Sequence, residues 1–518
     1  MTGDRRAGAA HAAASGLGAA GLILALDEGT TNTKALLVDP SAGAVVAVGS
    51  RPLGIAFPAP GWVEQDATEI WEATLGAIED CLAQVPGARL VGLSISNQRE
   101  SVAAWHRSTG APLGPVLGWQ DARTAEGCAA MGVGAAALVR ARTGLTLDPM
   151  YSAPKMRWLL DAAVATGVAV ADVCLGTIDA WLIRNLTGEH ATEAGNASRT
   201  LLLDLDGLAW DPDLLALFGV PASALPEVRA SDAGFGTTLG VGSLPPGVPV
   251  VAVLADSHAA LYQHGCTRPG AGKATYGTGS SVMTPCAGPD VAPEGITTTV
   301  AWLTGGTSPV PTYAREGNII ASGSALDWMA RTLGAGAQES GGAFLTRLAT
   351  EAADAGGVSF VPAFSGLGAP YWDRAATGVL TGVTGGTLRA HLARAALEAV
   401  AHQVVDVVEA IERDGAARID VLHADGGATA SALLMSTQAD LLGRAVRIAD
   451  EPEASALGAA LLAARTLGLA PTADPRASAA RVVEPAGTDR AARRRAWAAA
   501  VARSRGQAVA PSTADTSP

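Results

Sequence analysis

Short apolar runs alternate along this chain with segments in which apolar residues recur every three or four positions. The runs 22–26, 34–38 and 44–48 predict a meander of three strands. Asp66 is then suited to cap a helix, with Glu69 at the capping-box position and an apolar face made by Trp71, Leu75, Ile78 and Leu82. Strands and helices that alternate in this way predict an α/β fold.

Three later apolar runs end in polar residues. They lead into the segment 97–100 (NQRE), into Asp256 and into the segment 425–427 (DGG). Because ligands of α/β sheets bind at the carboxyl ends of the strands, these positions predict a common site.

The second half of the chain begins as the first half does. Strand-like runs over 274–276 and 282–284 flank a glycine turn, and 297–302 is predicted as the third strand of this repeat. The pattern predicts an internal duplication and two related lobes with a cleft between them. The predicted division is a disordered extension over 1–20, an N-terminal domain over 21–264, a C-terminal domain over 265–505 and a disordered tail over 506–518.

Composition narrows the class of protein. Of the 518 residues, 48% are hydrophobic and 62 are glycine, which suits an α/β protein with many tight turns. The net charge of −13 gives no reason to expect nucleic-acid binding. No apolar segment approaches the ~18 residues of a membrane span. Five scattered cysteines indicate a reducing cytoplasm, and the basic run 490–495 is interpreted as a solvated helix face, with a partner site as the alternative.

Three glycine turns share one chemistry: 27–31 (DEGTT), 276–279 (YGTG) and 425–427. Glycine lets backbone N–H groups approach an anion, and threonine hydroxyls add donors. Asp27 would repel a bare phosphate, so we interpret it as facing Mg²⁺ held between the carboxylate and the phosphates. One such turn is typical of any hairpin. The three together predict a phosphate-binding site.

Other residues suit a substrate that carries hydroxyl groups. Asp256, at a strand end, could accept a proton from such a hydroxyl; its alternative role is a helix cap. Arg99 and Glu100 offer donors and acceptors for neighbouring hydroxyls, or else form a surface ion pair. Trp62 and Trp119 would pack on a carbon skeleton or belong to the core.

Six segments, in one order between residues 22 and 505, resemble those of the FGGY carbohydrate kinases and, within that family, of the glycerol kinases. They are 26–31 (LDEGTT), 60–66 (PGWVEQD), 97–100 (NQRE), 196–200 (NASRT), 275–279 (TYGTG) and 364–372 (FSGLGAPYW). The resemblance implies an actin-like, ribonuclease H-like fold whose two lobes close over substrate and ATP, with Mg²⁺. We further expect a cytoplasmic homo-oligomer, dimer or tetramer, with no nucleic-acid or membrane partner.

The resemblance also implies roles for individual residues. Asp256 would be the base, and substrate would be bound by Arg99, Glu100, Trp119, Met150, Asp256 and Ser257. Asp27 would face the metal. The nucleotide would be bound by Thr30, Thr31, Asn32, Lys34, Thr278, Gly323, Asp327, Gly427 and Ser431, of which Asp327 and Ser431 stand at glutamine and asparagine positions of the glycerol kinases.

The substrate positions depart from the glycerol kinases. Met150 stands where those enzymes have a substrate-binding tyrosine, although Tyr151 next to it is a possible replacement. Ser257 replaces a glutamine, and Ser281 replaces an aromatic residue that covers the carbon chain. The smaller side chains predict a roomier pocket.

The first hypothesis is therefore an ATP-dependent kinase that converts glycerol to glycerol 3-phosphate. The alternatives are a kinase of a longer polyol, such as erythritol, threitol or xylitol, or of a ketose or sugar acid. From another class, an actin-like or chaperone-type ATPase without a small substrate would share the phosphate turns.

Overall fold

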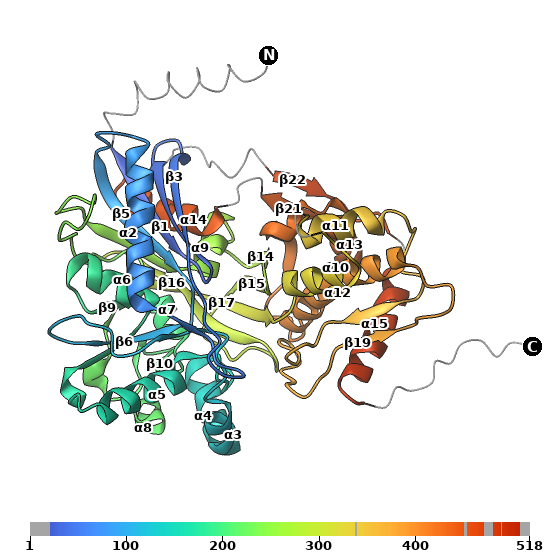
Figure 1. Ribbon diagram of the computed structural model, residues 1–518, viewed down its shortest axis with the longest axis horizontal. Coiled ribbons are helices and arrows are strands. Elements are labelled where there is room, and N and C mark those ends of the chain that lie inside the picture. The colour runs from blue at the N-terminus through green and yellow to red at the C-terminus, as the bar shows by residue number, and fades with distance from the viewer. Residues whose placement is uncertain (1–20, 337–338, 450–452, 471–479, 488, 508–518) are drawn as a thin grey trace, which may run out of the picture.

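The computed structural model describes residues 21–336, 339–449, 453–470, 480–487 and 489–507 (Figure 1). Figure 1 shows two lobes side by side, the blue-to-green one on the left and the orange-to-red one on the right, with the yellow strands β14, β15 and β17 reaching between them. In the described part of the chain, every helix is too short or too polar to cross a membrane.

The N-terminal sheet has the strand order β13-β5-β1-β2-β3. Strand β1 pairs antiparallel with β2 and parallel with β5. The predicted meander is confirmed, and the strands are β1 (Leu22–Glu28), β2 (Asn32–Asp39), β3 (Ala44–Pro52), β5 (Leu90–Asn97) and β13 (Val250–Ala255).

The second large sheet repeats this arrangement. Its order is β16-β17-β15-β14-β20-β21-β22, so β17-β15-β14-β20-β21 corresponds strand for strand to β3-β2-β1-β5-β13. The predicted duplication is confirmed. The strands are β14 (Gly270–Tyr276), β15 (Ser280–Cys286), β16 (Thr297–Thr304), β17 (Val310–Ile319), β20 (Ile419–Asp425), β21 (Val446–Ala449) and β22 (Ala480–Val483).

The prediction of 297–302 as the third strand of the repeat was wrong. Those residues form β16, which pairs only with the outer side of β17, and β17 takes the third place. The sequence of β17 hides this because Arg315 and Glu316 are buried within it, at 2% and 0% exposure, and interrupt the apolar pattern.

Helix α2 (Ala67–Ala83) begins at the predicted cap. The Asp66 carboxylate accepts hydrogen bonds from the N–H groups of Thr68 and Glu69. The Glu69 carboxylate instead accepts from Gly54 N at 2.8 Å, which is not the reciprocal bond of a capping box. The predicted apolar face is also rotated, since the buried residues are Ala67, Ile70, Thr74, Ala77, Ile78 and Cys81.

Small residues explain this rotation. A side chain at Gly49 of β3 would come within 2.0 Å of the Ala77 carbonyl, so helix and strand approach too closely for a large residue. The larger Trp71, Leu75 and Leu82 are left half-buried at the flanks of the contact.

Two helices join the lobes. Helix α9 (Asp256–Gln263) follows β13, and α14 (Ala454–Thr466) follows β21 at the corresponding place of the repeat. They pack against each other, and α14 also lies against β1 and β5 of the N-terminal sheet. A side chain at Gly458 would meet the Ala259 carbonyl at 1.9 Å, so glycine is required at this crossing.

The basic run lies on α15 (Arg490–Ser504), which packs on α12 (Arg389–Ile411) and nearby elements of the second lobe. Arg494 pairs with Asp406 of α12 at 2.5 Å, and Trp497 is buried. Arg490 and Arg493 also pair with glutamates of α12. The interpretation as a solvated face holds for Arg490 and Arg495, which are exposed, but not for Arg493 and Arg494, which are partly buried against α12.

The other elements extend the two lobes. The strands β4 (Glu64–Gln65), β7 (Val116–Leu117), β6 (Val102–His106) and β8 (Val173–Thr177) form a further sheet in this order. The remaining strands pair as β9 (Ala191–Glu193) with β12 (Glu227–Arg229), β10 (Leu203–Asp204) with β11 (Ala209–Trp210), and β18 (Ser359–Val361) with β19 (Val379–Thr381). The remaining helices of more than one turn are α3 (Ala125–Ala130), α4 (Gly132–Thr143), α5 (Ser152–Ala165), α6 (Ile178–Thr187), α7 (Ala194–Ser198), α8 (Pro212–Phe218), α10 (Gly323–Thr332), α11 (Gly341–Ala349) and α13 (Ala432–Leu442).

Candidate active site

A cavity of about 460 Å³ lies where polar strand ends of the two halves meet. We call it the substrate cavity. It brings together residues that lie as much as 344 positions apart, from Thr30 to Arg374. Among them are these predicted site residues: Thr30, Thr31, Arg99, Glu100, Trp119, Met150, Asp256, Ser257 and Thr278. Ser281 also lines it.

A second cavity, of about 710 Å³, shares Thr278 with the first. We call it the nucleotide cavity. Elements of the second lobe form it, and it contains the other predicted nucleotide residues Gly323, Asp327, Gly427 and Ser431. The two cavities therefore meet at the glycine turn that follows β14.

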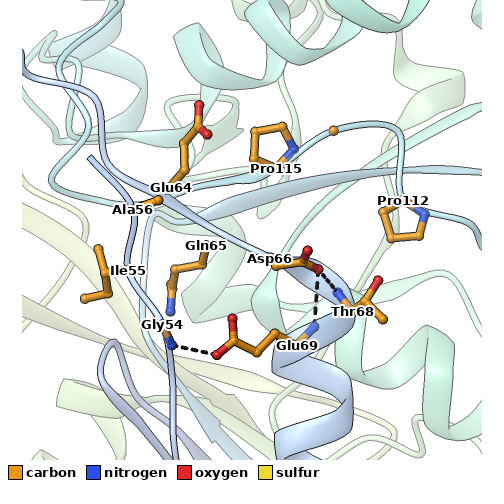
Figure 2. Close-up of a pocket in the computed structure, with 11 residues that line it drawn as sticks. Gly54, Ile55, Ala56, Glu64, Gln65, Asp66, Thr68, Glu69, Pro112 and Pro115 are labelled. Atoms are coloured by element: carbon orange, nitrogen blue, oxygen red, sulfur yellow. Dashed lines mark hydrogen bonds between the residues drawn. The ribbon is translucent and has the colours of Figure 1, made fainter. Parts of the chain in front are cut away.

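A third cavity, of about 650 Å³, adjoins the substrate cavity and shares Ile55 with it. Figure 2 shows its carboxylates near the start of α2. They are already engaged: Glu69 accepts from Gly54 N, Asp66 caps α2, and Glu64 pairs with Arg123 at 2.7 Å. None of the predicted site residues lines this cavity.

Several predicted residues lie outside the cavity walls. Lys34 Nζ pairs with Glu453 at 2.7 Å, and Asn32 Nδ2 donates to Ser50 Oγ at 2.8 Å. Trp62 packs edge-on against Trp158 and beneath Arg123. Trp62 thus packs against protein side chains and does not line the substrate cavity.

Asp256 is the first residue of α9 and follows the buried strand β13. Its Oδ1 accepts from Ser257 N at 2.5 Å and lies 3.2 Å from Arg99 Nε. Burial raises the pKa of Asp256, although the nearby guanidinium opposes this shift. Since Ala255 is the N-cap of α9, Asp256 does not act as the cap that was its alternative.

A chain of buried ion pairs positions the two substrate-side residues. Arg99 Nη1 contacts Glu316 Oε1 at 2.6 Å, Arg199 Nη1 contacts Glu316 Oε2 at 2.9 Å, and Arg199 Nε contacts Glu100 Oε1 at 2.7 Å. Burial alone would raise the pKa of Glu316, but the two guanidiniums hold it at about 2. This series of ion pairs links the N-terminal and C-terminal halves of the protein, because Glu316 belongs to β17 of the C-terminal half.

Sequence reasoning gave no role to Glu316 or Arg199. Arg199 lies in the segment 196–200, which could have marked it, whereas nothing in the pattern of β17 indicates Glu316. A third such residue is Lys155, which is completely buried and donates to the carbonyls of Gly118 and Met150 at 3.0 and 2.7 Å. Burial lowers the pKa of Lys155 to about 7.

Glu100 has an unusual backbone conformation, with φ of 63°. This left-handed region is costly for a residue other than glycine and is found where the surrounding structure imposes it. Here Ser152 Oγ donates to the Glu100 carbonyl at 3.0 Å, and Arg199 holds the carboxylate. Glu100 is in this way fixed in the lining of the substrate cavity.

The first glycine turn is held by side chains around it. Trp119 Nε1 donates to Thr30 Oγ1 at 3.0 Å, Gln65 Nε2 donates to the Thr30 carbonyl at 2.9 Å, and Gln98 Nε2 donates to the Gly29 carbonyl at 3.1 Å. The backbone of the turn is therefore preorganised.

Asp27 lies at the end of β1, next to this turn. Ser96 Oγ donates to it at 2.8 Å, and burial raises its pKa to about 6. Within the described residues, no group of three or more His, Cys, Asp or Glu side chains could hold a metal by itself. A single carboxylate beside a phosphate turn fits Mg²⁺, which usually binds one or two carboxylates together with waters and substrate phosphates.

Small hydroxyl side chains form the wall beside Asp256. Lys273 is completely buried, and its Nζ donates to Thr275 Oγ1 at 2.7 Å and to Ser281 Oγ at 3.1 Å. Ser281 Oγ is in turn 3.3 Å from Ser257 Oγ. Tyr151, by contrast, is fully buried beneath the Arg199 guanidinium and does not line the cavity, whereas Met150 does.

The sequence matches two halves of one known family. Residues 22–262 match the N-terminal domain of the FGGY family of carbohydrate kinases, and residues 272–467 match the C-terminal domain of that family. The matched ranges cover both large sheets up to the end of α14.

Individual relatives give the same family. The chain is 45% identical over 497 residues to apulose kinase of Pectobacterium atrosepticum, covering 93% of this chain and 98% of that protein. It is 44% identical over 460 residues to glycerol kinase of Geobacter sp., covering 87% and 91%. Among solved structures, Plasmodium falciparum glycerol kinase with ADP matches with a TM-score of 0.84 at 28% identity, covering 93% of this chain and 98% of that one.

Proposed function

Because the chain belongs to the FGGY family of carbohydrate kinases, we propose that it transfers the γ-phosphoryl group of ATP to a terminal hydroxyl of a polyol or ketose of four or five carbons. The observation that carries this proposal is the substrate cavity, which Arg99 and Asp256 line together with the small residues Ser257 and Ser281. An ATPase without a small substrate would have no use for these residues in one cavity.

The chemical step follows from the position of Asp256. As the substrate oxygen forms its bond to the γ-phosphorus, the bond from that phosphorus to the β–γ bridging oxygen breaks and ADP leaves. Asp256 accepts the hydroxyl proton, and its raised pKa suits a group that must take up a proton. Arg99, 3.2 Å away, keeps the carboxylate charged before the step and fixes its direction.

Thr30, Thr31 and Thr278 are the donors proposed for the phosphates, because all three line the substrate cavity and Thr278 also lines the nucleotide cavity. Asp27 would hold Mg²⁺, which neutralises phosphate charge when it is bound. Lys34 would join the phosphate site only by leaving Glu453, its present partner.

The size of the substrate is the finer part of the proposal. Sequence identity to the relatives does not decide the substrate size, because this chain is 45% identical to a relative named apulose kinase and 44% identical to one named glycerol kinase. The wall does favour a longer substrate, because Ser257 and Ser281 are small and are held in place by Lys273. Glycerol, the first hypothesis from the sequence, would leave part of this space to water.

A substrate series tests the proposal directly. ADP release by the purified protein is measured with glycerol, erythritol, threitol, xylitol, xylulose and apulose at equal ATP. We expect kcat/KM for at least one four- or five-carbon substrate to exceed that for glycerol by about tenfold or more, the discrimination typical of a few extra substrate contacts. A clear preference for glycerol would overturn the proposed substrate size.

The variant Ser281→Phe sharpens the test. The larger side chain should fill space beside the wall and lower kcat/KM for the longer substrate, while kcat/KM for glycerol is retained. The matched control is Ser108→Phe, at an exposed hydroxyl after β6, which should leave the preference unchanged. Equal losses for all substrates in Ser281→Phe would indicate general damage and not a change of pocket size.

A further inference from the structure

The substrate cavity contains a second arginine–carboxylate pair, away from Asp256. Arg374 Nη2 donates to both carboxylate oxygens of Asp148, at 2.7 and 2.9 Å. Both residues line the substrate cavity, on the side of Met150 and Trp372. Asp148 precedes α5 in the N-terminal half, whereas Arg374 comes from the segment after β18 in the C-terminal half.

Each partner is held by its own half of the chain. The Asp148 carboxylate also accepts from Met150 N at 2.9 Å. The segment that carries Arg374 is fixed because Trp372 Nε1 donates to the Gly295 carbonyl at 2.8 Å and Ala369 N donates to the Asn318 carbonyl at 2.9 Å. The pair is therefore a built feature of the cavity wall.

The pair has donors to spare. Both of its hydrogen bonds come from Nη2, and the structure of the described residues gives Nε and Nη1 of Arg374 no protein partner. The Arg374 side chain is 47% exposed and that of Asp148 is 11% exposed. A guanidinium has five N–H groups in a planar fork, so a ligand oxygen can be bound without breaking the ion pair.

We propose that Arg374 and Asp148 bind the end of the substrate that is not phosphorylated and thereby select for chain length. This rests on the proposed function. Arg99 with Glu100 would hold the hydroxyls near the reacting end, and Arg374 with Asp148 would hold an oxygen at the far end. A three-carbon triol bound at Arg99 would not extend to this second pair.

The charge of the pair also specifies the ligand class. Arg374 and Asp148 neutralise each other, so the far end should carry a neutral hydroxyl or carbonyl oxygen. A carboxylate there would be repelled by Asp148, and specificity often depends on such an unfavourable contact. The expected ligand is therefore a neutral polyol or ketose and not a sugar acid.

Arg374 and Asp148 could instead serve only to hold the two lobes together as a latch. This alternative predicts a different result. A latch acts on closure and would change kcat/KM for every substrate by the same factor. A contact to the far end of the substrate changes kcat/KM only for substrates long enough to make it.

The test compares substrates of different length in the full-length protein. Arg374→Gln and Asp148→Asn are assayed with glycerol, with the best four- or five-carbon substrate and with a five-carbon aldonate. We expect kcat/KM for the longer substrate to fall by about 10- to 100-fold in Arg374→Gln, mainly through KM, as for the loss of a hydrogen bond to a charged group. Glycerol and the KM for ATP should change less than about threefold.

Arg51→Gln is the matched control. Arg51 pairs with Asp80, and its side chain, at 45% exposed, is about as exposed as that of Arg374. It should change none of these values, and thermal melting shows whether any variant is misfolded.

Equal losses for all substrate lengths in Arg374→Gln, or a wild-type preference for the aldonate, would overturn the proposed far-end contact. The proposed function fails separately, if the wild-type protein releases ADP with none of these substrates, whereas a wild-type preference for glycerol overturns the proposed substrate size and the far-end contact together.

Discussion

The substrate cavity and the nucleotide cavity meet at Thr278 but are built differently. The substrate cavity is supported by buried charges. Arg99, Arg199 and Glu316 are each less than 9% exposed, and both arginines pair with Glu316. The nucleotide cavity is lined mainly by glycine and other small residues. Its charged side chains include Arg347, which is 59% exposed and pairs with Glu339 at 3.0 Å. The first cavity depends on fixed side chains and the second on backbone shape.

The duplicated fold makes this difference easy to trace. Strand β5 ends at the segment that contains Arg99, whereas its counterpart β20 ends at Asp425 and Gly426. Gly426 has φ of 92°, and a side chain there would meet the Tyr276 carbonyl at 2.6 Å. The segment after the strand thus supplies Arg99 to the substrate cavity in one lobe and Gly427 to the nucleotide cavity in the other. We expect single side-chain changes to have large effects in the substrate cavity and small ones in the nucleotide cavity.

The largest effect is expected for Asp256→Asn. Asparagine keeps the size of the side chain but cannot accept the proton, so kcat should fall by about 10² to 10⁴. The affinity for ATP, measured by calorimetry, should stay within about twofold of wild type, because Asp256 lies outside the nucleotide cavity.

Asp161→Asn is the control for this change. Asp161 is an exposed carboxylate of α5 that pairs with Arg157, and its loss should leave kcat unchanged. Near-normal turnover of Asp256→Asn would remove Asp256 from the role of base.

The next largest effect is expected for Glu316→Gln. Arg99 and Arg199 would remain buried without their shared counter-charge, and such a loss typically costs about 3 to 5 kcal/mol of stability. Urea unfolding measures this cost, and KM for the substrate should rise because Arg99 loses its support. Asp80→Asn, at the exposed pair with Arg51, should cost about 0 to 1 kcal/mol. Equal costs in the two variants would mean that burial does not strengthen the dependence on Glu316.

These charged residues also explain what the sequence could and could not predict. The apolar runs that form β1, β2 and β5 are separated by polar turn segments, so the sheet and its polar strand ends were predictable. Strand β17 was not, because Glu316 has the polarity of a surface residue and is buried only by virtue of Arg99 and Arg199. Glu316 therefore both interrupts the apolar pattern of this strand and holds the arginines of the site.

One other error has a related cause. The buried face of α2 was misjudged because Ala77 packs against Gly49, and a close approach of small residues has no hydrophobic signature. The role of Lys34 at the phosphates stays a prediction, and its partner Glu453, 419 residues away in the chain, could not be read from local sequence. The positions of glycine turns follow from local sequence, but the partners of charged side chains depend on the complete fold.

A buried carboxylate that pairs with no cation among the described residues gives a smaller effect that depends on pH. Glu193, in the substrate half, accepts hydrogen bonds from Asn196 N at 2.8 Å and Ser231 Oγ at 2.5 Å. Burial raises its pKa from 4.5 to about 7, opposite to the shift of Glu316. The folded state therefore binds this proton more tightly than the unfolded state, and the stability it contributes is lost as pH rises from 4.5 to 7.

Glu193→Gln should remove this dependence, because glutamine stays neutral. The free energy of unfolding of the variant relative to wild type should rise across that interval, by about 1 to 3 kcal/mol in total, and stay constant above it. Urea midpoints between pH 4.5 and 8 measure the difference. Glu227→Gln, at an exposed residue of β12, should keep the wild-type slope. A constant difference at every pH would contradict the raised pKa.

The smallest effect is expected for Asp327→Asn in the nucleotide cavity. Asp327 lines this cavity but is exposed to solvent, so its loss should change KM for ATP by less than about threefold and leave KM for the sugar or polyol unchanged. The matched backbone change is Gly426→Ala, which introduces a side chain at positive φ next to Tyr276 and should weaken ATP binding far more. Steady-state kinetics at varied ATP measure both variants. If Asp327→Asn weakened ATP binding more than Gly426→Ala did, side chains and not backbone shape would determine the nucleotide cavity, and the contrast between the two cavities would fail.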